Sequence, residues 1–511
     1  MDLVSNLLSF FLFLSFTGFA IALCAEWKRK RSLSSRGAKL PPGPSTLPLI
    51  GSMHHLAGAF PLRRLRDLAE KHGPLIHVQL GEVSAVIASS PDMAKAIFKT
   101  HDLAFASRPK LMVPEIVGYN RSDIVFSPYG DYWRQMRKIC IVELLSSKNV
   151  QSFGSIRLDQ VSRLLDAVAS HGGRPVNLTE LVFRFTSSMT CRSAFGSVFE
   201  EGDEFITHIR DVLVLLGGFD VADIFPSLKL LHGLSPIRRK ILKIHKRVDA
   251  ILNGVINGHQ KSLDAGNKGN GESGGEDLID VLLRMKRSDG LQFPVTDDSI
   301  KGVVFDMFTA GTETSSMTII WAMVEMLRAP AVLAEAQAEV RRAFINKKEF
   351  DLKDVEELKY MKLVVKETLR LHPPSPLSIP RECIKETEIN GYTIPVKTWI
   401  MVNVLSISTD PAYWENAESF VPERFENSSV DFLGNNFEFL PFGSGRRICP
   451  GLSFGLANVY LPLAKLLFHF DWKLPRGPEY CRTLDLAESS GITAGKKDDL
   501  YLVATPYNPL S

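Results

Sequence analysis

Hydrophobic positions recur every three or four residues over long stretches of the chain, a spacing typical of helices that pack against a core. One such stretch begins at Thr296-Asp297-Asp298, whose polar side chains favour a helix start, and runs to about Leu327. Apolar and small residues fall on one stripe of this segment: Ile300, Val303, Met307, Ala310 and Thr314. We therefore predict a long helix over 296–327 with one apolar face.

Strand patterns are few and short. Residues 77–88 (HVQLGEVSAVIA) alternate on either side of Gly81 and predict a hairpin, and Asn390-Gly391 predicts the turn of a second one. A last strand is expected near the C-terminus at residues 499–504 (DLYLVA). The expected fold class is α+β, mostly helical, with small β-sheets.

The N-terminal segment has a different pattern. Residues 3–25 are apolar and uncharged, long enough at ~1.5 Å per residue to cross a ~30 Å hydrocarbon layer. A basic cluster, Trp27 to Arg31, follows this segment, whereas only Asp2 precedes it, the reverse of a cleaved signal peptide. We predict a retained single-pass transmembrane helix over 1–27, in contact with membrane lipid, and the basic side places the body of the protein in the cytosol.

Three segments follow from this pattern. After the anchor, residues 28–44 are first basic and then rich in proline (LPPGP at 40–44), and they predict a stiff strap. Residues 45–511 contain no break in composition and are expected to form one large domain. Within it, residues 264–277 (DAGNKGNGESGGED) are too polar to pack and predict a surface loop. A second apolar surface is expected over residues 219–231 (FDVADIFPSLKLL).

Composition excludes several classes of protein. The 511 residues are 45% hydrophobic and 23% charged, enough for a large core, and the net charge of +3 does not favour nucleic acid as a partner. The six cysteines lie far apart, at positions 24, 140, 191, 383, 449 and 481, with no Cys-x-x-Cys pair. Neither a disulfide framework nor a zinc site is expected.

The strongest chemical pattern is Phe442 to Gly451, FGSGRRICPG. Its glycines at 443, 445 and 451 permit close backbone approach around Cys449, and the apolar run after Gly451 starts a helix whose N-terminus favours an ionised sulfur. A thiolate held under a large flat cofactor needs such a loop, so the spacing predicts a haem-thiolate site. The alternative for Cys449 by itself is an inert buried thiol.

A second pattern lies inside the predicted long helix, at Ala310-Gly311-Thr312-Glu313-Thr314. A glycine in mid-helix costs roughly 1 kcal/mol, which a small ligand lying against the bare backbone would explain. Thr314 would then hydrogen-bond bound dioxygen, and Glu313 would help to deliver protons. The alternative is a threonine that bonds only to its own helix.

These patterns resemble the cytochrome P-450 family. The loop fits Phe-x-x-Gly-x-Arg-x-Cys-x-Gly at every fixed position, and in that family the cysteine is the axial ligand of the haem iron. The resemblance runs from end to end. The chain is similar to the plant microsomal branch that oxidises terpenoids, in residues 107–140, 185–196, 217–229, 305–316 and 497–507. It implies the P-450 fold, a long central helix over the haem, and a haem-binding monooxygenase domain over 45–511.

The resemblance also implies roles for individual residues. Cys449 would hold the iron of haem b within a loop that includes Phe442, Gly445 and Gly451. Trp133 and Arg137 would hold a haem propionate, together with Arg447 and Arg381. A buried structural network would join Glu367, Arg370 and Arg424. The neighbouring face of the Trp133 helix, with Arg134 and Lys138, would receive an acidic electron donor, against the alternative of plain solvated charge.

For the substrate, the resemblance indicates four mostly apolar segments. The residues expected to contact it are Ile116, Phe305, Thr309, Ala310, Leu377, Ile379 and Ser490. A pocket with few polar side chains suits a hydrocarbon oriented by shape.

The implied function is haem-thiolate monooxygenation. Dioxygen and electrons from NADPH, passed on by NADPH-cytochrome P-450 reductase, would hydroxylate a sesquiterpene-type terpenoid at the endoplasmic reticulum membrane. A monoterpene indole alkaloid, a diterpene and a flavonoid stay open as other substrates. A haem-thiolate isomerase or dehydratase and a non-enzymatic haem binder stay open as other classes.

Overall fold

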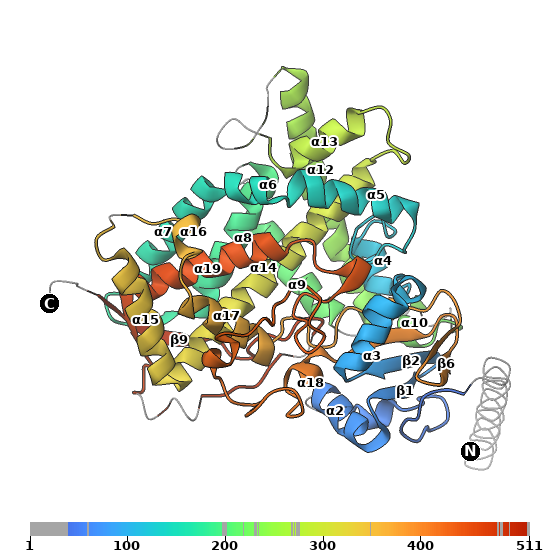
Figure 1. Ribbon diagram of the computed structural model, residues 1–511. Coiled ribbons are helices and arrows are strands. Elements are labelled where there is room, and N and C mark those ends of the chain that lie inside the picture. The colour runs from blue at the N-terminus through green and yellow to red at the C-terminus, as the bar shows by residue number, and fades with distance from the viewer. Residues whose placement is uncertain are drawn as a thin grey trace, which may run out of the picture.

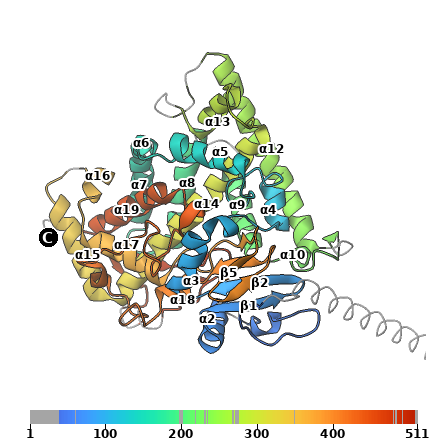
Figure 2. The same ribbon diagram turned by 45° about the vertical axis from the view of Figure 1, so that its right-hand side comes forward.

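A computed structural model describes residues 39–507, except for 59–60, 197–201, 218, 229–231, 234, 267–268, 270, 272–275, 348, 478–479, 481–483 and 490. Helices make up most of the body; β1, β2 and β6 lie at one side of it, and β9 lies at the opposite side beside α15 (Figure 1), while Figure 2 shows the body turned by 45°. The helices are α2 (Pro61–His72), α3 (Pro91–Lys95), α4 (Met112–Val117), α5 (Asp131–Ile139), α6 (Ser147–Ser152), α7 (Gly154–Ala169), α8 (Leu178–Phe195), α9 (Gly202–Leu216), α10 (Val221–Ile224), α12 (Pro236–Asp264), α13 (Leu278–Arg287), α14 (Asp297–Arg328), α15 (Pro330–Phe344), α16 (Leu352–Val355), α17 (Tyr360–Leu371), α18 (Val404–Ser408) and α19 (Leu452–His469).

The predicted central helix is confirmed as α14. Thr296 caps it, accepting from the Ser299 N–H, while Ser299 reciprocates at the Thr296 N–H. The prediction of one apolar face was wrong, because α14 is buried on nearly every side. It contacts α8, α9, α13, α15, α17 and α19, and it crosses both of the largest hydrophobic clusters. A helix enclosed in this way is a fixed platform for any side chain that it carries.

The strands form three small sheets. The largest has the order β1 (Leu75–Leu80), β2 (Val83–Ala88), β7 (Trp399–Val402), β4 (Arg381–Glu382). The second has the order β3 (Pro175–Asn177), β9 (Tyr501–Pro506), β8 (Phe470–Lys473), and the third pairs β5 (Thr387–Ile389) with β6 (Tyr392–Ile394). Both predicted hairpins and the late strand are thereby confirmed.

An ion cluster joins the end of α17 to the segment that leads toward the cysteine loop. Arg370 donates to both carboxylate oxygens of Glu367 at 2.8 Å, and Arg424 Nε donates to Glu367 Oε1 at 3.0 Å. The Arg370 and Glu367 side chains are 0% exposed, and Arg424 is 11% exposed. Removing one member of a buried ion cluster typically costs ~3–5 kcal/mol because the others are left uncompensated.

The predicted anchor, residues 1–27, lies outside the described residues, as does most of the strap. The described end of the strap runs along the sheet region, where the Lys39 carbonyl accepts from the Thr393 N–H and the Pro42 carbonyl from the His77 N–H. Among the described residues, no single helix combines the length and hydrophobicity that a membrane span requires; one bent pair, α14 with α15 at 116°, meets the criterion jointly by length and composition.

The last residue of the predicted surface loop at 264–277 is buried and does not face solvent. Asp277 is buried, caps the start of α13 at the Asp280 N–H, and lies 2.7 Å from His259 Nε2 of α12. Its carboxylate therefore ties two helices together instead of facing solvent.

Candidate active site

The cysteine loop is fixed by close backbone packing. Gly445 has φ +69°, and a Cβ placed there would come within 2.2 Å of the Phe98 carbonyl, so glycine is required. The Cys449 N–H donates to the Phe442 carbonyl at 3.0 Å, and Arg137 of α5 donates to the Ile448 carbonyl. α19 begins at Leu452, three residues after the cysteine.

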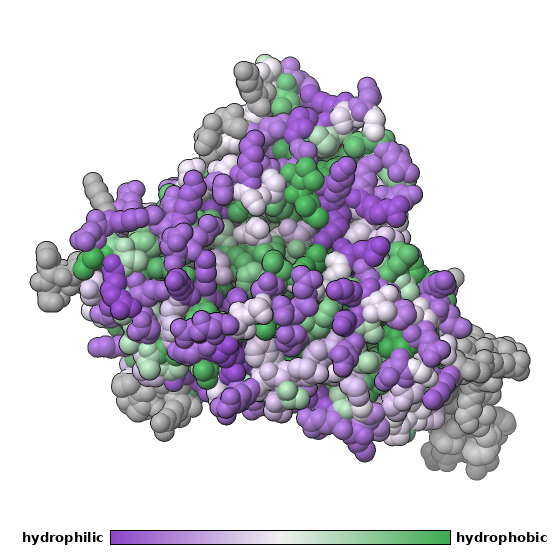
Figure 3. All heavy atoms as spheres, viewed as in Figure 1, coloured by the Kyte–Doolittle hydropathy of each residue, from purple (hydrophilic) through white to green (hydrophobic). Residues whose placement is uncertain are grey.

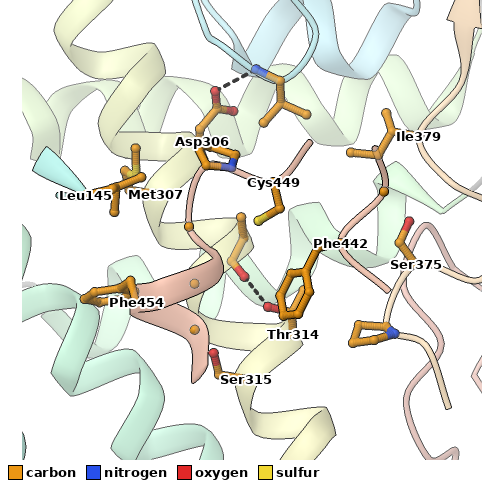
Figure 4. A pocket seen from close by; sticks show the side chains of 18 of the residues that line it. Leu145, Asp306, Met307, Thr314, Ser315, Ser375, Ile379, Phe442, Cys449 and Phe454 are labelled. Atoms are coloured by element: carbon orange, nitrogen blue, oxygen red, sulfur yellow. Dashed lines mark hydrogen bonds between the residues drawn. The ribbon is translucent and has the colours of Figure 1, made fainter. Parts of the chain in front are cut away.

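A cavity of about 290 Å³ separates this loop from α14. Cys449 and Phe442 reach it from the loop, and Ala310, Gly311 and Thr314 line it from the helix (Figure 4). A Cβ at Gly311 would come within 3.4 Å of the Phe454 ring, so a side chain there would narrow the space. The two sequence patterns, about 140 residues apart in the chain, thus face each other across one cavity.

The sulfur of Cys449 lies in an environment with opposing effects on its charge. Burial raises the pKa of the thiol, whereas the Gly451 N–H and the Arg137 guanidinium lower it by favouring the thiolate. A bound metal ion would settle this balance, because coordination deprotonates a thiol.

Four arginines line the same cavity: Arg108, Arg137, Arg381 and Arg447. Burial, followed by repulsion from Arg381, lowers the pKa of Arg447 to about 9, and burial lowers that of Arg381 to about 10 despite Asp102. The pKa of Arg108, whose residue is 5% exposed, is lowered well below its usual range by burial and by repulsion from Arg447 and Arg381. Such a cluster predicts an anionic ligand with more than one acidic group.

The buried carboxyl groups nearby have partners of their own. Asp102 accepts from Arg381 at 2.9 Å and from the Arg446 N–H at 2.9 Å. Asp306 accepts from the backbone N–H groups of Ile124 and Val125, and burial raises its pKa well above the ordinary range. Asp102 therefore offsets the charge of Arg381, whereas Arg108 and Arg447 donate to backbone carbonyls.

Trp133 packs against one arginine of this group, Arg447. Its indole N–H donates to the Ile124 carbonyl at 2.9 Å, and the Arg447 guanidinium lies 4.1 Å from its ring centroid. It is buried and is not among the residues that line the cavity. Arg108, in contrast, does line it and was missed, because a single arginine in Ser-Arg-Pro carries no local signal of burial.

The residues present fit a haem. Cys449 and Phe442 line the cavity opposite Ala310 and Gly311 of α14, and the four guanidinium groups that line it would neutralise the two propionates of a haem. Arg447 currently donates to the carbonyls of Ala106, Ile124 and Ser127, and Arg108 to those of Val125, Ile379 and Pro380.

The two expected proton-handling residues point in different directions. The Thr314 hydroxyl lines the cavity and donates to the Ala310 carbonyl at 2.6 Å, the helix-bonded arrangement considered as the alternative above (Figure 4). Glu313 accepts at Oε2 from the Thr493 hydroxyl at 2.8 Å, and burial raises the pKa of its carboxyl. Thr493 has no sequence signal because it lies 180 residues away.

The expected substrate contacts divide into two groups. Ala310 and Ile379 line the cavity, whereas Ile116, Phe305, Thr309 and Leu377 pack into the surrounding clusters or hydrogen-bond within α14, and Ser490 lies outside the described residues. Phe305 of α14 does not line the cavity, whereas Met307, which belongs to the predicted stripe of this helix, does.

The comparisons agree with this site. A family model described as Cytochrome P450 matches residues 41–497, so the chain belongs to the cytochrome P450 family of haem-dependent monooxygenases. It is 66% identical over 504 residues to premnaspirodiene oxygenase of Hyoscyamus muticus, covering 99% of both chains. It is 62% identical over 506 residues to 5-epiaristolochene 1,3-dihydroxylase of Nicotiana tabacum, again covering 99% of both.

A solved structure shares the fold. A zebrafish cytochrome P450, in a structure with progesterone, matches with a TM-score of 0.75 over 88% of this chain and 99% of that one, at 24% identity.

Replacing Cys449 by serine should remove the red-shifted carbon monoxide band that marks a thiolate-bound ferrous haem, because serine supplies no sulfur. The measurement is the carbon monoxide difference spectrum of the reduced protein. The matched control is Cys140→Ala, a buried thiol outside the cavity, which should keep the band. A Cys449→Ser protein that kept it would place the iron on another ligand.

Proposed function

We propose that this monooxygenase hydroxylates a sesquiterpene-type hydrocarbon. The observation that carries the proposal is the cavity itself, where Cys449 faces a helix surface of small residues and the remaining lining is mostly apolar. The relatives named above, premnaspirodiene oxygenase and 5-epiaristolochene 1,3-dihydroxylase, support a terpene of this size. An apolar cavity holds such a substrate by shape and by excluding water.

Haem b bound through a cysteine thiolate supplies the cleavage of dioxygen and the insertion of one oxygen atom into a C–H bond. Cys449 would ligate the iron, and Arg108, Arg137, Arg381 and Arg447 would hold the propionates. The reaction balances as substrate, dioxygen, NADPH and a proton giving hydroxylated substrate, water and NADP⁺. The electrons would come from NADPH through NADPH-cytochrome P-450 reductase.

The chain would supply the protons through Thr314 and Glu313. Because the Thr314 hydroxyl donates its own proton to the Ala310 carbonyl, its oxygen is left as an acceptor that can orient a water in the cavity. Glu313 is the nearest acid in sequence, on the same enclosed helix. An isomerase or dehydratase has no need of such a pair, which favours monooxygenation.

The reductase would bind beside α5. The basic patch expected there consisted of Arg134 and Lys138. Arg134 is paired with Asp131, so Lys138 is the clearest positive charge of the patch. A groove runs between α5 and the segment after α13, lined by Gln135, Lys138 and Val142 among others. Apolar side chains gather on this face between α5 and α13 (Figure 3), and exposed Ile141 and Val142 follow α5. A mixed apolar and basic surface suits a partner with an acidic rim.

The substrate class is tested with microsomes that contain the protein and a reductase. A panel of sesquiterpenes, a diterpene, an indole alkaloid and a flavonoid is supplied with NADPH, and products are identified by mass spectrometry. A sesquiterpene should give a mono-hydroxylated product and a substrate-induced shift of the haem spectrum. Turnover of the alkaloid or flavonoid, with neither product nor shift from any sesquiterpene, would contradict the proposal.

We also propose that the protein resides in the endoplasmic reticulum membrane with its body in the cytosol. The uncharged segment 3–25 supports this, and so does an apolar surface near the described N-terminal end. Leu47 is 46% exposed and Val221 49% exposed. Hydrogen bonds from the Gly81 N–H to the Ile50 carbonyl and from the Glu82 N–H to the Ile224 carbonyl bring these segments together. Ile224 itself, expected on this surface, is buried.

Deleting residues 1–40 should therefore weaken membrane attachment without abolishing it. In that background Leu47→Asp with Val221→Asp should release the protein, since charges on this surface oppose contact with lipid. Ile345→Asp, an equally exposed apolar position after α15, is the control and should leave the attached fraction unchanged. Flotation with vesicles at low salt measures that fraction, and a truncated protein that is wholly soluble would exclude the second surface.

A further inference from the structure

We propose that Thr493 is a positioning residue that holds the Glu313 carboxyl and thereby ties proton delivery to the C-terminal loop beside the active site. The inference rests on the proposed role of Glu313 as a proton carrier. It assigns a task to a residue outside the Ala310–Thr314 pattern.

The contact is a single hydrogen bond between distant parts of the chain. Thr493 Oγ1 donates to Glu313 Oε2 at 2.8 Å, and Glu313 lies next to the cavity-lining Thr314 on α14. Among the described residues, Glu313 Oε1 has no hydrogen-bond partner of this kind. Thr493 therefore fixes one carboxylate oxygen and leaves the other to exchange protons with water.

The loop keeps Thr493 in place from the adjoining residue. The Ala494 N–H donates to the Pro374 carbonyl at 3.1 Å, and the indole N–H of Trp321 donates to the Ala494 carbonyl at 3.4 Å. Trp321 belongs to α14, the helix that also carries Glu313. The loop with the Thr493 hydroxyl is thus bonded to the helix that carries the Glu313 carboxylate. This attachment reduces the conformational entropy that is lost when the two groups form their hydrogen bond.

The two arms of the loop are also held to each other and to the end of α17. The Ser489 N–H donates to the Gly495 carbonyl at 2.7 Å, and Glu488 pairs with Lys496 in an antiparallel bridge. His372, which follows α17, lies parallel to the Trp321 ring with centroids 3.9 Å apart, and its Nδ1 is 3.6 Å from Glu488. Thr493 accordingly lies between two braced parts of the chain.

Electrostatics give the hydroxyl a definite effect. Burial raises the pKa of Glu313, and the Thr493 hydrogen bond is the larger of two influences that lower it. The other is Arg210 of α9, the charged group that acts on Glu313 from a neighbouring element and is itself 3.1 Å from Glu180. Since a hydroxyl donates to a carboxylate and so favours the ionised form, Thr493 keeps Glu313 ready to accept a proton.

The proton step balances at Glu313 alone. The carboxylate takes a proton from one water at Oε1, becomes neutral, releases that proton to another water, and returns to its ionised form. Without Thr493 the carboxyl would stay protonated to higher pH and would be free to rotate, so less of it would be available and correctly oriented.

The test compares Thr493→Val, which removes the hydroxyl and keeps the branched shape, with Thr493→Ser, which restores the hydroxyl, and with Glu313→Gln. In the reconstituted holoenzyme we expect Thr493→Val to lower product per NADPH by roughly 3- to 10-fold, the factor for one hydrogen bond, with more hydrogen peroxide released. Thr493→Ser should stay within about 2-fold of wild type. The double variant with Glu313→Gln should add little to Glu313→Gln alone.

A second readout does not depend on turnover. An infrared pH titration of the resting haem protein follows the Glu313 carboxyl band, identified by its loss in Glu313→Gln. In Thr493→Val its midpoint should rise by about 1 pH unit, since the lost donor favoured the ionised form. The carbon monoxide band and the substrate-induced spectral shift should be unchanged, which separates positioning from damage to the fold.

Three outcomes overturn the proposal. A Thr493→Val enzyme with the product per NADPH and the Glu313 midpoint of wild type would overturn the proposal. If Glu313→Gln were still defective in that case, the proposed function would stand. Equal losses in Thr493→Ser and Thr493→Val would show that the hydroxyl is not the cause. A Glu313→Gln enzyme with unchanged coupling would remove the proton role of Glu313 itself.

Discussion

Buried positive charge beside the Cys449 sulfur is the constraint on which the site depends. Arg108, Arg137, Arg381 and Arg447 line one cavity; Asp102 pairs with Arg381, whereas the Asp306 carboxyl accepts from backbone N–H groups. A folded chain bears such a cluster only with a compensating anion or with hydrogen bonds to every donor. Here the donors of Arg108 and Arg447 reach backbone carbonyls, which satisfies their geometry but not their charge. A planar dianion that also offers an iron to the sulfur meets both needs.

The fold places these charges around α14, a helix held on most sides by other helices. α14 is enclosed by six other helices, so Ala310 and Gly311 present a fixed bare surface opposite the sulfur. The Glu367–Arg370–Arg424 cluster anchors the segment that leads to the cysteine loop, and Gly445 seats that loop on Phe98. Ligand side and distal side are therefore built by separate parts of the chain that meet only in the folded protein.

Local patterns in the sequence predicted the parts of this arrangement that local physics controls. The start of α14 follows from a polar cap at Thr296, and the hairpin turns follow from Gly81 and Asn390-Gly391. The cysteine loop follows from its spacing. What failed to emerge depends on tertiary placement: Arg108 is one arginine in a tripeptide, and Thr493 meets Glu313 across 180 residues. Three residues of the predicted α14 stripe, Met307, Ala310 and Thr314, do line the cavity, whereas Phe305, expected from the family resemblance, packs into a hydrophobic cluster instead.

The central claim is that this cavity joins one atom of dioxygen to an apolar substrate. Its most direct test is to run the reconstituted enzyme with an accepted sesquiterpene under oxygen-18 gas in ordinary water and to weigh the product by mass spectrometry. The account predicts one oxygen-18 atom in each new hydroxyl group, with the other atom leaving as water. A hydroxyl oxygen that came from ordinary water, or product formed from a hydroperoxide without dioxygen and NADPH, would contradict it.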